Sequence, residues 1–95
     1  MLKTYVYGLC EGRHPEQPVK EGIFAHNIAR PSDVKNLEDI ANKRIPIDCD
    51  RLAVYISGMT AAVIAVVNVC RMRNIQLTLY HYNKWSKVYY KQEVL

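Results

Sequence analysis

The sequence contains few cysteines, and their spacing suits neither cross-linking nor metal binding. Cys10, Cys49 and Cys70 are odd in number, and no two of them form a C-x-x-C pair. An odd number argues against a disulfide framework, and the wide spacing argues against a zinc site. We therefore expect no metal ion, no other cofactor and a reducing, cytoplasmic setting.

The sequence also lacks the pattern of a secretory leader, an internal repeat and a low-complexity segment. Residues 1–3 run directly into alternating residues without the long apolar stretch of a signal peptide. The net charge of +4 is modest, and the lysines and arginines are scattered instead of forming one stripe. This distribution disfavours binding of duplex DNA. It suits a small anionic ligand, a short nucleic acid or an ordinary solvated surface.

Aromatic residues other than tyrosine are almost absent, with one phenylalanine and one tryptophan against seven tyrosines. Tyrosine suits half-buried sheet faces and ligand walls, because its ring packs while its hydroxyl reaches a polar partner. A chain of 95 residues, 49% of them hydrophobic, has room for one core and no second. Residues 1–95 are therefore expected to form a single domain.

The first half of the chain predicts a strand, a long loop and a helix. Residues 2–9 alternate and are rich in β-formers, and the glycines and prolines that follow cannot continue a sheet. Residues 23–28 predict a short second strand. Ser32 is expected to cap an amphipathic helix over residues 33–43, with Asp33 favouring the positive end of its dipole.

Residues 52–70 contain no charged side chain, which allows two interpretations. Nineteen residues at about 1.5 Å each nearly cross a hydrocarbon core of about 30 Å, so one interpretation is a membrane span. The β-rich residues 52–56 and the turn-forming residues 57–60 favour the other, a strand, a turn and a helix. Asn68 also argues against a lipid-facing helix, because its amide would be left unpaired. We favour the second interpretation.

The helix of this unit is expected to run from residue 60 or 61 to residue 73, with Asn74 just beyond its end. Its first two turns are apolar on every side, so it needs cover beyond the sheet. We expect a second copy of the chain to supply that cover through residues 61–70. Ala61 and Ala65 would permit close backbone approach, and the protein would be a homodimer or a higher oligomer.

The last part of the chain predicts two strands, over residues 76–82 and 87–94, joined as a β-hairpin. A strand, helix and strand at this spacing cross over right-handed, so the strands that begin at residues 52 and 76 should be parallel. The predicted fold class is α/β. It is a small, mixed, Rossmann-like sheet with a parallel β-α-β unit and a C-terminal hairpin.

Ligands of open α/β sheets gather beyond the carboxyl ends of the parallel strands. Here that edge presents Ser57, Gly58 and Thr60 at a helix N-terminus, where free amides and hydroxyls suit an anion. The same residues would also serve as a tight turn capped by Thr60. If the first strand is parallel too, Gly8 and Arg13 lie near this edge, and Arg13 can pair with a phosphate.

The strand over residues 76–82 ends close to the same edge. Tyr82, Asn83 and Trp85 follow there, and an aromatic ring beside an anion site can stack on a base. The alternative for Trp85 is simple packing in a hairpin turn.

Catalytic constellations are poor. His14, His26 and His81 lie on separate segments, and nothing spaces them as metal ligands or pairs them with a nucleophile. Glu11 and His14 are the pair we consider for acid–base work, and both also suit an ordinary loop. The sequence neither shows nor excludes an enzyme.

Residues 45–58, the apolar helix and residues 79–90 resemble the small CRISPR-associated ring nucleases with a single CARF-like domain, over about half of the chain. Members of that family bind cyclic oligoadenylate across a homo-oligomer, and active members open the ring with a metal ion. The resemblance implies a CARF-like fold and a ligand pocket at Ser57, Gly58 and Tyr82.

One feature of that family is missing. Asn83 stands where the family has an aspartate, and the family's helical histidine has no counterpart near Cys70. The resemblance therefore favours ligand binding over metal-dependent cleavage.

Together these features predict a homo-oligomeric α/β protein that binds an anionic nucleotide, such as a cyclic oligonucleotide of antiviral defence, as a sensor or a sponge. Tyr82 or Trp85 would stack on a base. Two alternatives stay open. One is a phosphodiesterase-type ring nuclease that uses Glu11, His14 or Ser57, and the other is a protein-interaction module without a ligand.

Overall fold

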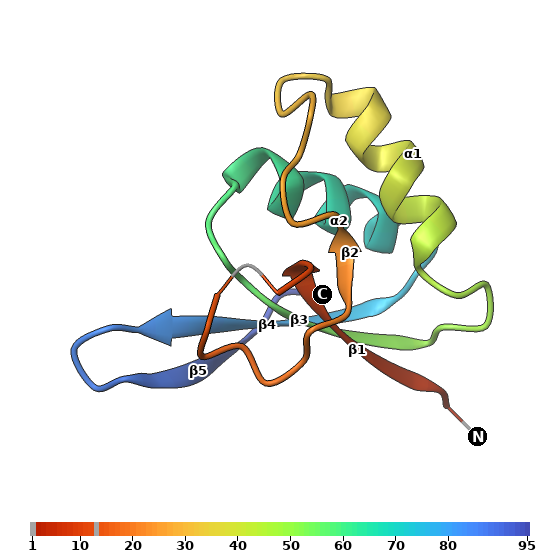
Figure 1. Cartoon of the computed structure of the whole chain (residues 1–95). Coiled ribbons are helices and arrows are strands. Elements are labelled where there is room, and N and C mark those ends of the chain that lie inside the picture. Colours follow the sequence, from red (N-terminus) through yellow and green to blue (C-terminus); the bar gives the residue numbers. More distant parts are fainter. Residues whose placement is uncertain (1, 13) are drawn as a thin grey trace.

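Five strands form one mixed sheet, and two helices cover one of its faces (Figure 1). The computed structural model describes residues 2–12 and 14–95. In chain order the elements are β1 (Thr4–Cys10), β2 (Gly22–Phe24), α1 (Val34–Arg44), β3 (Arg51–Tyr55), α2 (Thr60–Met72), β4 (Gln76–Asn83) and β5 (Val88–Glu93). The predicted α/β class, the parallel β-α-β unit and the C-terminal hairpin are confirmed.

In the strand order β2-β1-β3-β4-β5, the side on which the next strand is added reverses between β1 and β3. From β1 the chain turns to one side to form β2, and it then crosses back to lay β3 and β4 on the other side. Strands β2, β1, β3 and β4 are parallel, whereas β5 is antiparallel to β4. In open sheets, ligands bind beyond the carboxyl ends of the two strands that flank such a reversal. Here those strands are β1 and β3.

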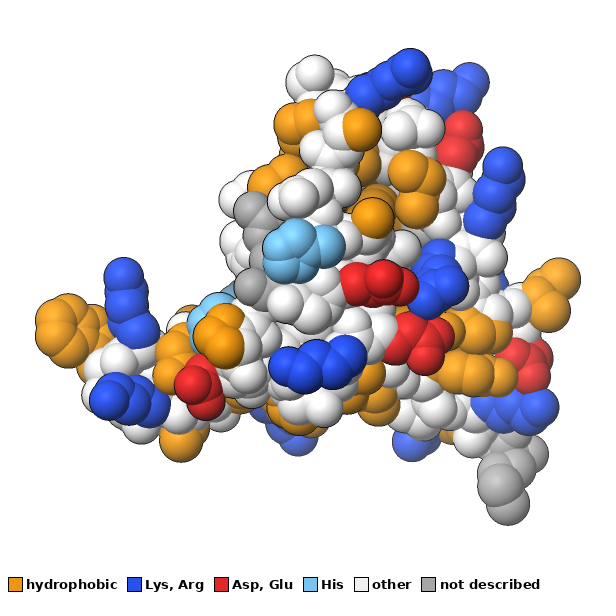
Figure 2. Space-filling view, in the orientation of Figure 1, with side chains coloured by type: hydrophobic (Ala, Val, Ile, Leu, Met, Phe, Trp, Pro, Cys, Tyr) orange, Lys and Arg blue, Asp and Glu red, His pale blue; other side chains and the backbone are white. Residues whose placement is uncertain are grey.

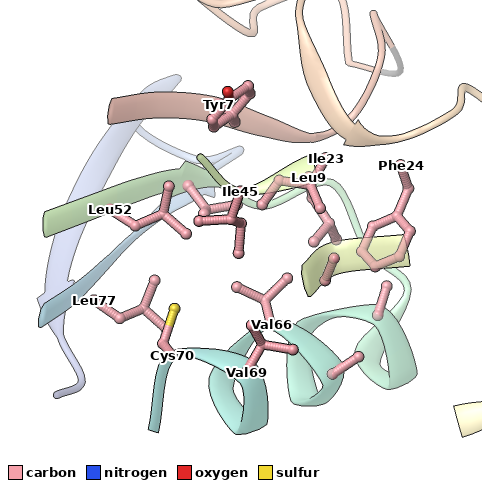
Figure 3. Packing of buried hydrophobic residues seen from close by; sticks show 14 of the residues in the cluster. Tyr7, Leu9, Ile23, Phe24, Ile45, Leu52, Val66, Val69, Cys70 and Leu77 are labelled. Carbon is pink, nitrogen blue, oxygen red and sulfur yellow. The ribbon is translucent and has the colours of Figure 1, made fainter. Parts of the chain in front are cut away.

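The hydrophobic core lies between the sheet and the two helices (Figure 3). Leu52 of β3 and Leu77 of β4 face Val66 and Val69 of α2, and all four are buried. Alternate residues of the same strands point to the opposite face of the sheet. The alternation therefore gives each strand one core face and one face that is open for a loop or a ligand.

Strand β2 is shorter than the predicted 23–28. It pairs with β1 only over Gly22–Phe24, and the chain bends at His26 and Asn27. The residues expected to continue the strand instead begin the connection to α1.

The first helix starts one residue later than predicted, and its cap differs. Asp33, and not Ser32, is the N-cap, because its carboxylate accepts a hydrogen bond from the amide of Asn36 at 3.1 Å. The helix therefore runs over Val34–Arg44 instead of residues 33–43. A side chain directly before the first helical turn reaches the free amide three residues on, and Ser32 is one residue too early.

Helix α1 covers part of the apolar surface of α2, which was expected to require a second copy of the chain. Leu37 and Ala41 of α1 are buried in the common core. Asn68 of α2 donates to the carboxylate of Glu38 on α1 at 2.8 Å. Asn68 thus has the polar partner that it would lack in lipid.

The other end of α2 is tied to the segment that follows α1. The Arg73 guanidinium donates to the carbonyl oxygens of Ile45 at 3.2 Å and Pro46 at 2.6 Å. Asn74 has the left-handed φ of 57° expected of a residue just past a helix end. Helix α2 has 13 residues. Within residues 2–12 and 14–95, none of the helices is both long and apolar enough to span a membrane.

The buried thiols of Cys49 and Cys70 are expected to resist alkylation and thiol–disulfide exchange in the folded protein. Burial raises the pKa of Cys70 to about 12, and it also raises the pKa of Cys49. Because the thiolate is the reactive species, both should react with Ellman's reagent at pH 8 only after denaturant is added. Rapid release of thionitrobenzoate from the native protein by either thiol, assigned with single Cys→Ser variants, would contradict this.

Candidate functional site

The connection from β3 to α2 has an unusual backbone. Gly58 has φ of 81° and Met59 has φ of 54°, so two successive residues adopt left-handed angles. Met59, and not Thr60, precedes the first helical residue, and no side chain caps the helix. The expected Thr60 cap is therefore wrong, because Thr60 already lies in the first turn, where its hydroxyl is past the capping position.

This turn leaves hydrogen-bonding groups unused. The amides of Gly58, Met59 and Thr60 make no hydrogen bond within the described part of the chain. The hydroxyl oxygen of Ser57 is buried and likewise has no partner among the described residues. A buried polar group without a partner is costly, so it indicates a place where a ligand or water supplies the missing bond.

A pocket of about 420 Å³ opens beside this turn. It is lined by His14, Ile56, Ser57, Gly58, His81, Tyr82, Lys84 and Tyr90. Three segments meet there: the loop after β1, the turn after β3 and the β4–β5 hairpin. Among the described residues, the lining includes one lysine, two histidines and no carboxylate, which suits an anion.

His14 reaches this pocket from the loop after β1. Its ring lies 4.6 Å from that of Tyr82, centroid to centroid. Its Nδ1 accepts a hydrogen bond from the Glu16 amide at 3.1 Å. An acceptor at Nδ1 means that a neutral His14 carries its proton on Nε2, which makes Nε2 a donor.

A group of tyrosines adjoins the pocket on the sheet face away from the helices. Tyr55 and Tyr80 stack with ring centroids 4.7 Å apart, and Tyr89 meets the edge of Tyr55 at 4.8 Å and of Tyr82 at 5.3 Å. Burial raises the pKa of Tyr89, whose hydroxyl has no partner among the described residues. These contacts hold the Tyr82 ring in a fixed position at the pocket wall.

One of the predicted site residues, Glu11, lies away from this pocket. Glu11 faces away toward α1, where its carboxylate lies 3.5 Å from the Arg44 guanidinium in a separate pocket beside β2. It shares no pocket with His14, so the suggested acid–base pair is not assembled. Arg13 lies outside the described residues.

Gly8 has a packing role that the sequence did not indicate. The Gln17 side chain lies directly over it, and a Cβ at Gly8 would overlap the Gln17 amide. Gln17 is only 3% exposed, and its Nε2 donates to the carbonyls of Cys10 and Val19. Gln17 therefore fastens the loop that positions His14, and nothing in the local sequence distinguishes it from an ordinary loop glutamine.

The predicted hairpin residues are divided between two roles. The side-chain oxygen of Asn83 accepts from the amides of Trp85 at 2.9 Å and Ser86 at 3.3 Å, so it shapes the turn. Trp85 is 92% exposed and does not line the pocket. The alternative for Trp85, packing in the turn, is wrong, because the hairpin extends beyond the helices (Figure 1).

Within the described residues, no group of three or more His, Cys, Asp or Glu side chains could hold a metal ion. No family model, no curated protein and no solved structure matches this chain.

Proposed function

We propose that this protein binds an anionic nucleotide in the pocket between the β3–α2 turn and the β4–β5 hairpin. The observation that supports this best is the buried, unpartnered Ser57 hydroxyl beside three unused amides at a helix N-terminus. That arrangement offers several donors to one phosphate group. Lys84 adds a full positive charge, and the described residues of the lining include no carboxylate to oppose an anion.

The aromatic wall supports a nucleotide over a simple anion. Tyr82 is held in place by His14 and Tyr89, and Tyr90 on the same pocket is 54% exposed. A base can stack on such rings while its phosphate is held at Ser57. The resemblance to CRISPR-associated ring nucleases with a CARF-like domain adds cyclic oligonucleotides to the candidates. The protein would then act as a sensor or sponge of antiviral defence, in the cytoplasm.

Thermal shift and equilibrium dialysis with nucleoside monophosphates and with linear and cyclic oligonucleotides test this proposal. Ser57→Ala should weaken binding about tenfold, because a hydrogen bond to a charged phosphate contributes about 1.5 kcal/mol. Ser32→Ala, an exposed serine before α1, is the matched control and should change nothing. Failure of every ligand to bind the wild-type protein would reject the proposal. Chromatography of the recovered ligand distinguishes binding from cleavage.

We also propose self-association through the exposed side of α2. Ile64 is 50% exposed there, beside the half-buried Val63 and Val67. Ile64→Lys should convert an oligomer into a monomer in sedimentation velocity at micromolar concentration. Ile47→Lys is the control, because Ile47 is 98% exposed and lies outside α2. A monomeric wild-type protein at that concentration would contradict the proposal.

A further inference from the structure

The tip of the β4–β5 hairpin exposes an unusual amount of aromatic and apolar surface. Trp85 is 92% exposed and Val88 is 58% exposed. Tryptophan is usually buried for most of its surface, and large exposed apolar side chains that cluster mark interaction sites. Figure 2 shows hydrophobic and basic side chains gathered at this end of the molecule.

The charge at the tip of the hairpin is of one sign. Residues 83–90 include Lys84 and Lys87 and contain no aspartate or glutamate, whereas Lys91 lies 3.9 Å from the Glu93 carboxylate at the end of β5 and is paired with it. The ring at the tip therefore stands among cations without a neutralising carboxylate in this segment. That combination suits a partner that offers both a flat π-face and negative charge.

The tip is continuous with the pocket. Lys84 lines the pocket and is next to Trp85 in the chain, and Tyr90 lines the pocket and is itself 54% exposed. Asn83 and Val88 pair at the end of the hairpin ladder. Tyr90 lies two residues further into the ladder, roughly 7 Å from its end at about 3.3 Å per residue. Trp85 lies in the turn beyond the end of the ladder. A ligand that fills the pocket and continues past Lys84 would pass toward Trp85, the next residue in the chain.

We infer that the ligand is a single-stranded oligonucleotide of at least two nucleotides. One phosphate occupies the pocket at Ser57 and Gly58, Lys84 contacts the backbone that leaves it, and a neighbouring base stacks on Trp85. The inference rests on the proposed function. A membrane surface fits less well, because Trp85 and Val88 supply little apolar area and the adjoining pocket is built for an anion.

Trp85 is the only tryptophan of the chain, so its fluorescence reports on the tip alone. The probes are adenosine monophosphate, a linear tetraadenylate and a cyclic tetraadenylate, with the matching uridine set. Both tetranucleotides, or one of them, should quench Trp85, whereas the monophosphate should bind without quenching. Trp85→Ala should weaken tetranucleotide binding roughly 10- to 100-fold and leave monophosphate binding unchanged. Trp85→Phe, which keeps an aromatic face, should retain most of the affinity.

The outcomes distinguish failure of this inference from failure of the proposed nucleotide binding. If monophosphate and tetranucleotides bind, but Trp85 is not quenched and Trp85→Ala binds all of them as the wild type does, the inference is overturned while the proposed function stands. If none binds to the wild-type protein, both are rejected. A change in Trp85 fluorescence on adding anionic vesicles, without any change on adding an oligonucleotide, would also overturn the inference. Comparison of the linear with the cyclic tetranucleotide shows which of these two forms of oligonucleotide the site binds.

Discussion

Gly22→Ala is expected to lower the free energy of unfolding by about 3 kcal/mol, because a Cβ at this position has no space. It would overlap the backbone nitrogen of Glu11 and approach the carbonyl oxygen of Phe24 at 2.8 Å. Both neighbours are backbone atoms, which cannot rotate away as a side chain would. The substitution must therefore separate β2 from β1, and thermal or urea denaturation would measure the loss.

The matched control is Gly12→Ala, ten residues earlier in the same connection. A Cβ there meets nothing within 4 Å, so the cost is limited to its left-handed φ of 52°. We expect about 1 kcal/mol for this substitution. Equal losses for the two variants would show that steric overlap at Gly22 is not what constrains β2.

Gly8→Ala is expected to cost about 2 kcal/mol, and nearly all of that cost should vanish when Gln17 is also truncated. The new Cβ would displace the buried Gln17 amide from the carbonyls of Cys10 and Val19. Gln17→Ala alone should cost a similar amount, because it leaves those carbonyls without their donor. In that background, however, Gly8→Ala has space.

A double-mutant cycle measures this coupling directly. The double variant should be little less stable than Gln17→Ala, which gives a coupling energy of about 1.5 kcal/mol between residues nine positions apart. Strictly additive losses would mean that Gly8 and Gln17 act independently. Hydrogen exchange should also show faster opening of the loop over residues 11–21 in all three variants.

The substitutions at Gly22, Gly8 and Gln17 are also expected to affect the ligand site, because all three residues contact the loop that carries His14. His14 belongs to the connection between β1 and β2, which Gly22 closes at the sheet and Gln17 fastens over Gly8. A loosened loop withdraws His14 from Tyr82 and opens one wall of the pocket. Nucleotide affinity should therefore fall in parallel with loop protection, even where the variant stays folded.

Much of the fold followed from local patterns. The uncharged stretch of residues 52–70 contains both a strand and a helix, and the Arg51–Tyr55 strand and Thr60–Met72 helix lie within a residue or two of prediction. The alternation over residues 2–9 predicted β1, which spans Thr4–Cys10, and Asn74 lies just beyond the end of α2 as expected. These features depend on residues close together in the chain, where periodicity and backbone preference decide the outcome.

The helix caps show that such patterns do not identify the capping residue itself. Ser32 and Thr60 are good capping residues, yet Asp33 caps α1 and Met59 precedes α2. Which of two adjacent residues caps a helix depends on the path by which the chain enters it. At α2 the left-handed pair Gly58 and Met59 sets that path, and composition does not reveal it.

The sequence by itself determined the α/β class, the parallel β-α-β unit and the sheet edge at which Ser57 and Gly58 meet Tyr82. Only the tertiary structure decided that α1 covers α2, that Glu11 pairs with Arg44 and that Trp85 stands free of the pocket. The reason is the range of the interactions. Secondary structure is selected by neighbours in the chain, whereas the partner of a side chain is selected by packing between segments far apart in sequence.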